Sequence, residues 1–415
     1  MFFECSRLSL RRANKVDHPN HVFPRDITSV TDWLIAGARS APQPEQVLSE
    51  LCNRLSACGI PLWRVEVFVR TLHPNVIGRR FRWQADEGTV VRAAPFAPPD
   101  KAETRESLVS RVCADGDPVR RQLFRAECPA DFPLLQELRA EGVTDFWASP
   151  LVFTDGDMHA AIWTTREPRG FTEEHMSGLE TIVEPLARIA EVRALRRTAA
   201  NLLDTYVGNR TGQRILAGQI RRGHTEAINA AIWLSDMRGF TALSDRIAMP
   251  IMIDILNRYF DCQVPGILER GGEVLEIMGD GLLAMFHIDH ASETHRVCGD
   301  ALTAALEART NIAAIDLTGI EDVKDISFGL ALHVGEVLYG NIGGGNRLDF
   351  TCIGPAVNLT ARLEKVAAQL GRTIVTSSAF AAHIESQLIP LGEFSVRGFG
   401  AQQMVFGLVD EPNSS

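Results

Sequence analysis

Apolar and polar residues alternate along the first half of this chain in patterns that predict both helices and strands. The stretches TDWLIAGA (31–38) and PEQVLSELCNRLSACG (44–59) carry helical signals, whereas WRVEVFVRTL (63–72) has the alternation typical of a strand. The segment FWASPLVFTDGDMHAAIWTTRE (146–167) predicts a hairpin that turns at Asp155-Gly156-Asp157. Residues 85–125 between them are more polar and rich in Pro, Ala and charged residues. Mixed helices and strands predict an α+β domain.

A long helix is predicted to close this domain, within FTEEHMSGLETIVEPLARIAEVRALRR (171–197). Thr172, followed by two glutamates, suits a helix N-terminus. Pro185 indicates a kink or a break. Apolar residues three or four positions apart form one stripe along this helix: Leu179, Ile182, Val183, Leu186, Ile189 and Val192. The stripe favours pairing with a second copy, as in a coiled-coil stalk, and packing on its own domain is the alternative.

The second half of the chain shows a sharper pattern. AINAAIWLSDMRGFTALSDRI (227–247) predicts a buried strand that ends at Asp236, a short loop, and a helix that begins near Thr241. GGEVLEIMGDGLLAMF (271–286) predicts two strands around the turn Gly279-Asp280-Gly281. Further on, strands alternate with Gly-rich turns until a helix opens at Pro355, a residue that suits the first helical turn.

Composition narrows the class of protein. A length of 415 residues allows two domains, and a net charge of −10 argues against a general nucleic-acid binder. No apolar run approaches the roughly 18 residues that a membrane span needs. The first residues, MFFECSRLSLRRANK, carry an acid and arginines where a signal peptide needs an apolar core, so a cytoplasmic location is expected. The eight cysteines form no CxxC pair, which fits reduced thiols.

Two aspartates are the first candidates for chemistry. Asp236 lies at the end of a strand, and the loop from Met237 to Thr241 offers backbone N–H groups beside a helix N-terminus, which is a ready anion site. Asp280 lies at a hairpin tip. If the two strands are neighbours, both carboxylates converge beside phosphate-binding amides, an arrangement that suits magnesium. Either aspartate alone is more simply a cap or turn residue.

The later helix supplies further candidates. Asn358 and Arg362 are four residues apart, so they project from the same helix face. Asparagine can hydrogen-bond a sugar oxygen, and arginine can stabilise charge that develops on a phosphate. Arg397, in FSVRGFG, is a possible second phosphate clamp near a strand end.

At this point the chain resembles a known family. Residues 226–410 are similar to the catalytic domain of the class III adenylate and guanylate cyclases, and five stretches carry the resemblance in the family's order: LSDMRGFTALSD, GGEVLEIMGDGLLAMF, ALHVGEVLYGNIG, TCIGPAVNLTARLE and FSVRG. The upstream LLDTYVGNRTGQRILAGQIRRG resembles the lead-in segment of bacterial members that carry an N-terminal sensor domain. The resemblance implies a ferredoxin-like α+β fold for this domain.

The resemblance also implies a role for each matching position. It makes Asp236 and Asp280 ligands of two Mg²⁺ ions, which Mn²⁺ can replace, with a backbone carbonyl from Met237. It assigns Asn358 to the ribose and Arg362 to the transition state. The phosphate-binding positions are the amides of Arg238, Gly239, Phe240 and Thr241, with Arg397 in the place of a lysine.

The family works as a head-to-tail dimer with composite sites, so the resemblance implies a homodimer. It implies attack of the ribose 3′-hydroxyl on the α-phosphate of ATP, giving 3′,5′-cyclic AMP and pyrophosphate.

The residues alone do not decide between ATP and GTP as the substrate. Glu276 stands where adenylate cyclases usually carry lysine and guanylate cyclases usually carry glutamate, and Thr351, the second base-reading position, does not decide because a hydroxyl can donate or accept. Glu276 held by a salt bridge away from the base is a further reading.

The predicted organisation has four parts: a loose arm at 1–25, a sensor domain at 26–177, a helical linker at 178–225 and the catalytic domain at 226–410. The sensor domain resembles a GAF domain in its element order and closing helix, which predicts an unidentified small-molecule or protein regulator. A structural domain with no ligand is the alternative. We expect an adenylate cyclase, with a guanylate cyclase as the alternative. A catalytically inactive nucleotide-binding module is a second alternative, but no metal, ribose or transition-state position has been lost.

Overall fold

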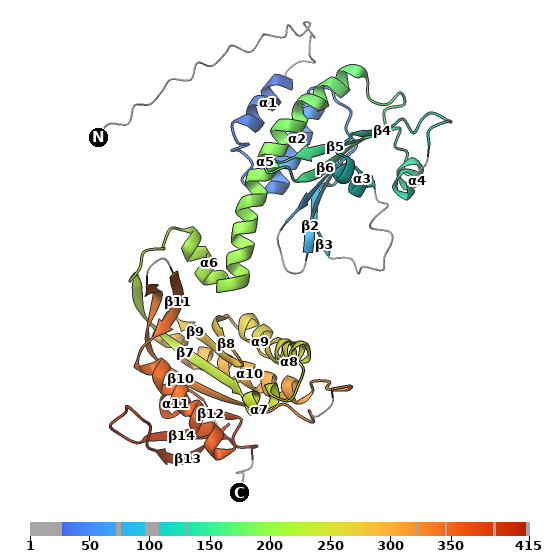
Figure 1. The fold of residues 1–415 in the computed structure, drawn as a ribbon. Helices are drawn as coiled ribbons and strands as arrows, with labels where there is room; N and C mark the ends of the chain where they lie inside the picture. Colours follow the sequence, from blue (N-terminus) through green and yellow to red (C-terminus); the bar gives the residue numbers. More distant parts are fainter. Residues whose placement is uncertain are drawn as a thin grey trace, which may run out of the picture. The chain divides into compact units, whose positions relative to one another are not determined.

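The computed structural model describes residues 27–71, 76–95, 108–129, 132–320, 323–344, 347–384 and 387–411, and the predicted arm at 1–25 lies outside these ranges. The chain forms two compact units, Met1–Ala199 and Ala200–Ser415, called unit 1 and unit 2 below (Figure 1). No helix in the described ranges has both the length and the apolar character needed to cross a bilayer.

Unit 1 is built on an antiparallel sheet of six strands in the order β3-β2-β1-β6-β5-β4. The strands are β1 (Arg64–Arg70), β2 (Val76–Gln84), β3 (Gly88–Pro95), β4 (Val119–Arg121), β5 (Asp145–Val152) and β6 (Met158–Thr165). β1 confirms the predicted strand, and β5 with β6 confirms the predicted hairpin. The polar stretch at 85–125 contains β3, β4 and a short helix.

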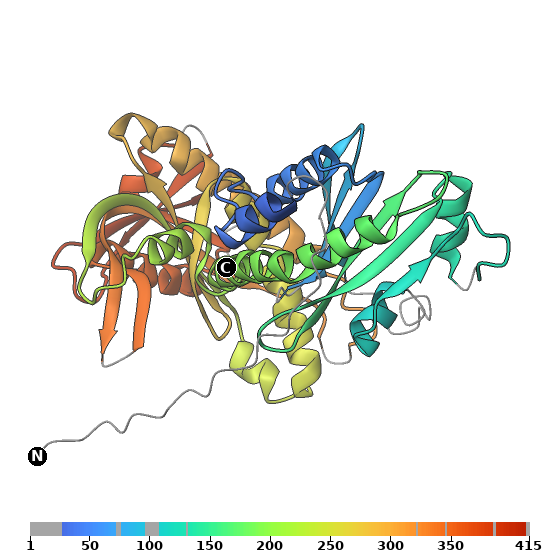
Figure 2. The same ribbon diagram turned by 90° about the horizontal axis from the view of Figure 1, so that it is seen from above.

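Helices cover both faces of this sheet (Figure 2). The helices α1 (Ile27–Ile35), α2 (Pro44–Ala57) and the first part of α5 (Glu173–Val207) share one core with the sheet, and α3 (Leu108–Asp115) and α4 (Pro133–Ala140) share the other. Adjacent residues of a strand point to opposite faces. Phe146 accordingly packs in the α3–α4 core, while Trp147 packs in the core with α1, α2 and α5.

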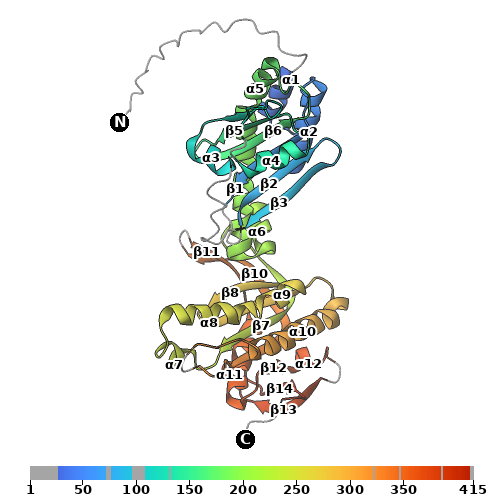
Figure 3. The same cartoon turned by 90° about the vertical axis from the view of Figure 1, so that its right-hand side faces the viewer.

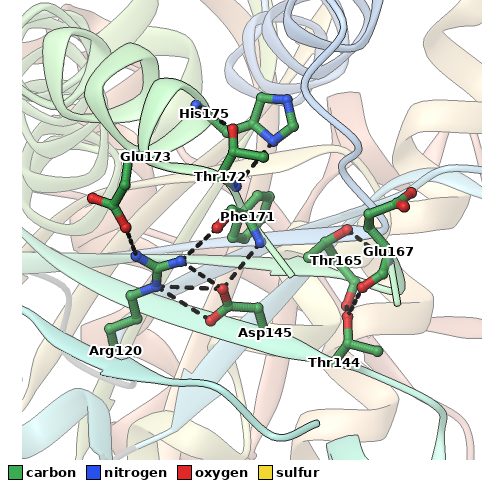
Figure 4. Close-up of polar contacts among 9 residues, drawn as sticks. All are labelled: Arg120, Thr144, Asp145, Thr165, Glu167, Phe171, Thr172, Glu173 and His175. Carbon is green, nitrogen blue, oxygen red and sulfur yellow. Dashed lines mark hydrogen bonds and ion pairs between the residues drawn. The ribbon is translucent and has the colours of Figure 1, made fainter. Parts of the chain in front are cut away.

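A buried ion pair fixes the approach to α5 (Figure 4). Asp145 on β5 is fully buried, and Arg120 on β4 donates to its Oδ2 at 2.8 Å. The amide of Phe171 donates to the same oxygen at 3.0 Å, and Arg120 returns a hydrogen bond to the Phe171 carbonyl at 2.7 Å. Gly170, with φ of +72°, lies so close that a Cβ there would be 2.7 Å from Oδ2 of Asp145. The cluster therefore joins two strands to the start of α5.

Thr172 caps α5 as predicted. Its Oγ1 accepts a hydrogen bond from the amide of His175 at 3.1 Å, and the amide of Thr172 donates to Nδ1 of His175 at 3.3 Å (Figure 4). This reciprocal cap satisfies donors that the helix itself cannot satisfy. α5 continues through Pro185 without a break.

The apolar stripe of α5 packs mainly on its own domain, so the alternative to coiled-coil pairing holds for most of it. Leu179, Ile182 and Leu186 are buried in the unit 1 core, and Val183 and Ile189 pack against that core. Val192, the last residue of the stripe, is exposed, as are three further apolar residues of α5: Leu195, Leu202 and Tyr206.

Unit 2 is built on a sheet in the order β13-β14-β12-β10-β7-β9-β8, with β11 paired to β10. Its strands are β7 (Thr225–Met237), β8 (Gly272–Met278), β9 (Gly281–Ile288), β10 (Phe328–Gly344), β11 (Arg347–Ile353), β12 (Ile374–Ser377), β13 (Leu388–Phe394) and β14 (Gln403–Leu408). β10 and β12 are parallel, and the other pairs are antiparallel. The predicted strand at 227–236 and the predicted hairpin at 271–286 are confirmed.

Helices also cover this sheet on two faces. On one face lie α8 (Met249–Asp261), α9 (Val264–Glu269) and α10 (Thr294–Ala313), preceded by the short η2 (Ala291–Glu293) (Figure 3). On the other lies α11 (Pro355–Leu370), which opens at the predicted proline. The remaining helices are α6 (Asn209–Leu216), α7 (Phe240–Ser244) and α12 (Ser378–Ala381). β7 is buried from both sides, because Trp233 faces the first layer and Ile232 the second. The predicted α+β class is confirmed for both units.

A buried hydrogen-bond network fastens α6 to the sheet of unit 2. The amide and hydroxyl of Thr211 donate to Oε1 of Glu273 at 3.0 and 2.7 Å, and Tyr339 donates to Oε2 at 2.8 Å. Nε2 of His287 lies 3.2 Å from the same Oε2. Burial raises the pKa of Glu273, but the hydrogen bonds from His287, Thr211 and Tyr339 outweigh burial and lower it overall. Glu273 is therefore a satisfied buried carboxylate that joins the lead-in helix to β8.

Candidate functional site

The two predicted aspartates converge at one edge of the unit 2 sheet. Asp236 is the residue before the end of β7, and Asp280 lies in the turn between β8 and β9. β7 and β9 are neighbours, with Ser235 opposite Leu282. A Cβ on Gly281 would lie only 3.3 Å from Oδ1 of Asp236. A glycine after Asp280 therefore lets the hairpin turn approach the carboxylate of Asp236 closely.

The electrostatics of the pair are those of a site that lacks positive charge. Burial, the negative charge of Asp280 and a hydrogen bond between the two side chains together raise the pKa of Asp236 to about 7, with burial the largest cause. Glu364 adds to this effect, and Lys365 opposes it. Two carboxylates this close cannot both ionise readily without a cation.

This donor set fits a divalent cation. Carboxylate oxygens are the ligands that Mg²⁺ prefers, and Mg²⁺ is commonly held by one or two carboxylates together with substrate phosphates. Within the described ranges, no group of three or more His, Cys, Asp or Glu side chains gathers into a metal cluster.

The loop after β7 presents backbone amides beside this pair. Gly239, with φ of +70°, precedes α7, so the amides of Phe240 and Thr241 lie in a first helical turn, where N–H groups lack intrahelical partners. The amide of Arg238 instead donates to the carbonyl of Ser327 at 2.8 Å. Its guanidinium donates to the carbonyl of Ala367 at 3.1 Å. The available anion-binding amides are therefore those from Gly239 onwards.

One face of α11 carries the predicted ribose and transition-state residues, and a different face points to the aspartate pair. Asn358 is exposed and Arg362 is half-buried, and neither side chain has a hydrogen-bond or ion-pair partner within the described ranges. Glu364 is buried, and its Oε1 lies 2.6 Å from where a Cβ on Gly329 would be. Gly329 pairs with Asp236 across β10 and β7. Glu364 thus faces the aspartate of its own chain, and burial raises its pKa.

The two predicted base-reading positions lie on β8 and β11, which contact each other. Glu276 is exposed, beside a bulge in β8 where Leu275 has no partner on β9. No ion pair holds Glu276 within the described ranges, so the salt-bridge reading gains no support. Thr351 is half-buried and lies opposite Gly340 of β10. Arg397 lies in a turn past the end of β13, and its side chain is exposed.

Two acids of this region were not singled out from the sequence. Glu364 lies two residues after Arg362, and only the packing of α11 on β10 shows that it faces Asp236. Glu273 lies in the same hairpin as Asp280 and directly before Val274 and Leu275, so the apolar character of β8 was the signal that could have indicated its burial. A buried acid requires partners, which would have pointed to the polar residues Tyr339 and His287 on neighbouring strands.

Comparison with known proteins identifies the class of this domain. Residues 224–409 match the family described as the adenylate and guanylate cyclase catalytic domain. Unit 2 therefore carries a class III cyclase catalytic domain, and the predicted recognition is confirmed for this part of the chain.

Individual relatives are distant. The adenylate cyclase of Anabaena cylindrica is 28% identical over 189 residues, which are 45% of this chain and 37% of that protein. The terminal-differentiation specific adenylate cyclase of Dictyostelium discoideum is 26% identical over 184 residues, which are 43% of this chain and 8% of that protein. The chain thus spans well under half the length of these curated relatives.

Two solved structures align with part of this chain. The adenylyl cyclase CyaB from P. aeruginosa aligns with a TM-score of 0.41 at 23% identity, over 46% of this chain and 97% of that one. The guanylyl cyclase Cya2 aligns with a TM-score of 0.38 at 26% identity, over 44% of this chain and 93% of that one.

Proposed function

We propose that this protein is an adenylate cyclase, which converts ATP to 3′,5′-cyclic AMP and pyrophosphate. The observation that carries the proposal is the convergence of Asp236 and Asp280, two carboxylates without a compensating cation, beside helix-terminal amides in a cyclase catalytic domain. Such a pair is costly unless it serves to bind a cation, and perturbed carboxylates of this kind gather at functional sites.

The residues divide the work by position. Asp236, Asp280 and the carbonyl of Met237 would hold two magnesium ions, which when bound supply Lewis acidity and neutralise the triphosphate. The amides of Gly239, Phe240 and Thr241 bind phosphate oxygens, since a helix N-terminus attracts anions. Arg238 contributes to this loop through its position and its contacts with α11 rather than through its own amide, which is committed to Ser327. Arg397, exposed past β13, reaches the triphosphate from the solvent side.

The reaction itself is a single displacement. The ribose 3′-oxygen forms a bond with the α-phosphorus, the bond from that phosphorus to the bridging oxygen breaks, and pyrophosphate leaves, with the hydroxyl proton released to solvent. Asn358 orients the ribose, and Arg362 stabilises the charge that develops on the α-phosphate. Positioning and electrostatics supply most of the rate enhancement.

The geometry of α11 supports a homodimer with composite sites. Successive residues of a helix are about 100° apart, so a residue two positions away lies on nearly the opposite face. Glu364 faces Asp236 of its own chain, and Arg362 therefore points away from it. Asn358 shares the face of Arg362. A second copy must then bring Asn358 and Arg362 to the aspartates of the first, and C2 symmetry gives two such sites.

A guanylate cyclase is the second candidate, and one observation favours it. Glu276 is exposed and has no ion pair within the described ranges, so its carboxylate is free to accept from N1–H and the 2-amino group of guanine. Facing adenine, it would set an acceptor against N1. The third reading, a module that binds nucleotide without catalysis, has no lost residue to support it. In either case we propose that unit 1 regulates the rate at which unit 2 forms the cyclic nucleotide.

Product analysis tests the proposal directly. The purified chain is incubated with equal ATP and GTP, in Mg²⁺ and separately in Mn²⁺, and the products are identified by mass spectrometry. Cyclic AMP as the main product supports the proposal, cyclic GMP supports the second candidate, and neither product under any condition supports the inactive module.

Complementation tests the composite site. Asp280→Ala and Arg362→Ala are each expected to be inactive, because one lacks a metal ligand and the other the transition-state arginine. Mixed after subunit exchange, they form a heterodimer with one intact site and recover activity. Heterodimers confirmed by differential tags but without activity would contradict the head-to-tail arrangement.

A further inference from the structure

Unit 1 contains a cavity that the proposed catalytic function does not use. It has a volume of about 260 Å³ and lies between the first turn of α2, the strands β1, β2 and β3, and α5. All its lining residues belong to unit 1. The cavity lies on the sheet face that carries α1, α2 and α5, and it remains although the surrounding core is well packed.

Most of this cavity is apolar. The register of the sheet explains why: Val67 lies opposite Phe81, and Phe81 lies opposite Val91, so three side chains of adjacent strands share one face. Leu48 of α2 and Leu186 of α5 close this part from above. A void with such walls loses dispersion contacts on every side, so an apolar group that fills it gains them.

One end of the cavity is polar and positively charged. Arg79 lies opposite Val69 on the neighbouring strand, and Thr71 continues the same face of that strand. Nε of Arg79 and Oγ1 of Thr71 are buried and have no hydrogen-bond partner in the described part of the chain. Arg197 reaches this end from α5, eleven residues after Leu186 and on the same helix face.

The charges at this end are not balanced. Three arginines and one glutamate line the cavity, and one of the arginines, Arg193, already donates to the carbonyls of Ala41 and Pro42. Burial and the nearby Arg197 lower the pKa of Arg79, and Glu45 only partly opposes them. The guanidinium groups of Arg79 and Arg197 repel each other, and the buried Nε of Arg79 has no acceptor within the described part of the chain. One anionic group at this end of the cavity would offset the repulsion and accept from Nε.

We propose that this cavity binds a small monocarboxylate with an unbranched or aromatic apolar body, its carboxylate between Arg79 and Arg197 and its body between the sheet and α5. A carboxylate accepts two parallel hydrogen bonds from a guanidinium, which a neutral group of the same size cannot do. It also accepts from the hydroxyl of Thr71. The apolar walls exclude a ligand that is charged throughout, such as free phosphate.

The volume sets the size of the ligand. A water molecule takes about 30 Å³ of liquid, so the cavity holds on the order of nine water-sized groups. Octanoate, with about ten non-hydrogen atoms, matches this when its carboxylate sits at the polar end. The ligand would contact Leu186, Ala190 and Arg197, and α5 is continuous from Glu173 to Val207.

Calorimetric titration of the full chain tests the proposal, with octanoate as the probe and 1-octanol and inorganic phosphate as comparators. We expect octanoate to bind with one site per chain, at least tenfold more tightly than 1-octanol, because charge-assisted hydrogen bonds are lost in the alcohol. Across butanoate, hexanoate and octanoate, affinity should rise about fourfold for each added CH₂ and stop rising when the cavity is full.

Three variants locate the site. Arg79→Gln and Arg197→Gln should each weaken octanoate about tenfold and leave 1-octanol unchanged. Arg92→Gln is the matched control, because Arg92 is exposed on β3 next to Val91 and lies outside the cavity lining. Ala190→Phe should block both ligands by filling the cavity. Arg197 is exposed, so its variant is expected to fold even if the Arg79 variant does not.

Several results would overturn the inference. These are no octanoate binding to the folded chain, equal binding of octanoate and 1-octanol, or octanoate binding that survives both Ala190→Phe and Arg197→Gln. Phosphate that binds in competition with octanoate would instead assign a general anion site. The proposal is independent of the cyclase assignment, because its readout is binding and not catalysis.

Discussion

Asp145 in unit 1 and Asp236 in unit 2 are both acids on a strand of a central sheet, but their surroundings are opposite. Asp145 is fully buried, yet Arg120 and the amide of Phe171 satisfy its Oδ2. Asp236 is only half-buried, yet it lies beside Asp280 with no cationic group bonded to it in the described ranges, and burial with that second charge raises its pKa to about 7.

The comparison teaches that depth alone does not separate structural acids from functional ones. A buried charge with a complete set of partners stabilises one arrangement of the backbone, and removing a partner is strongly destabilising. A less buried acid that faces another acid lacks such partners in the protein itself, so the pair points to a bound cation or substrate.

Strand β8 repeats the contrast within one element. Glu273 accepts hydrogen bonds from Thr211 and Tyr339 and lies beside His287, whereas Glu276, three residues further, is exposed and has no ion pair within the described ranges. A bulge between Val274 and Glu276 shifts the register between the two acids. The first is a structural residue, and the second is free to meet a substrate.

The largest effect is expected from removing the charge of Asp145, the buried acid that pairs with Arg120. Asp145→Asn should lower the free energy of unfolding of unit 1 by about 3–5 kcal/mol, because Arg120 loses its buried counter-charge and keeps only the exposed Glu173. Chemical unfolding followed by tryptophan fluorescence reports mainly on unit 1, since Trp233 is the one tryptophan of six outside it. Glu173→Gln is the control: Glu173 also pairs with Arg120, at 3.5 Å, but its side chain is 94% exposed, so the loss should stay within about 0.5 kcal/mol. Equal losses in the two variants would contradict the distinction.

The unpaired acid should behave in the opposite way. Asp236→Asn is expected to lower kcat/KM for cyclisation at least a hundredfold, about 3 kcal/mol, because it removes a ligand of the proposed metals. Its free energy of unfolding should be unchanged or higher without Mg²⁺, since the variant relieves repulsion by Asp280. Asp245→Asn, an exposed acid just past α7, is the control for activity. A variant that keeps more than about a tenth of the wild-type rate would remove Asp236 from the proposed site.

The acid of the α6 network offers a test through pH. The folded-state pKa of Glu273 is lowered, so its contribution to stability is complete above the ordinary value of about 4.5 and is lost as the pH falls through the folded-state value. Glu273→Gln should therefore cost unit 2 about 2–3 kcal/mol at pH 7, and the gap to the wild type should close below about pH 4. Hydrogen exchange of β8 and α6 peptides measures it, with Glu276→Gln as the control. A gap that does not change with pH would mean that packing, not charge, explains the loss.

Much of the fold could be predicted from the sequence where a local pattern determines structure. Alternation indicated β1, an apolar run indicated β7, and turn residues indicated the hairpins at Asp155-Gly156-Asp157 and Gly279-Asp280-Gly281. The partners of the α5 stripe could not be predicted, because an apolar helix face fits equally well against a sheet or a second copy. The two strands and the helix within residues 85–125 were not predicted, because that stretch is polar and has few apolar runs.

The candidate site divides in the same way. Asp236 and Asp280 could be found because each lies at the end of a strand with a clear apolar pattern. Their proximity followed from the expectation that the two strands are neighbours in one sheet. Glu364 could not be found, since its approach to Gly329 depends on how α11 packs on β10. The cavity of unit 1 was also invisible, because Arg79 and Arg197 are far apart in sequence and meet only through the fold.

The smallest effect, on base selection, is expected from the exposed acid of β8. Glu276→Lys replaces an acceptor with a donor at the position where the purine edge is expected, so adenine N1 gains a partner and guanine N1–H loses one. A good base-edge contact is worth about 1–3 kcal/mol, so the ratio of kcat/KM for ATP over GTP should rise about 5- to 150-fold. Metal dependence should not change, because Asp280 is untouched, and Glu269→Lys, an acid at the end of α9, is the matched charge reversal outside the hairpin. Competition between ATP and GTP in one reaction measures the ratio directly. An unchanged ratio in a folded, active variant would show that Glu276 does not face the base. The argument for GTP would then fail, and Glu276 could no longer be contrasted with Glu273 as the acid of β8 that meets a substrate.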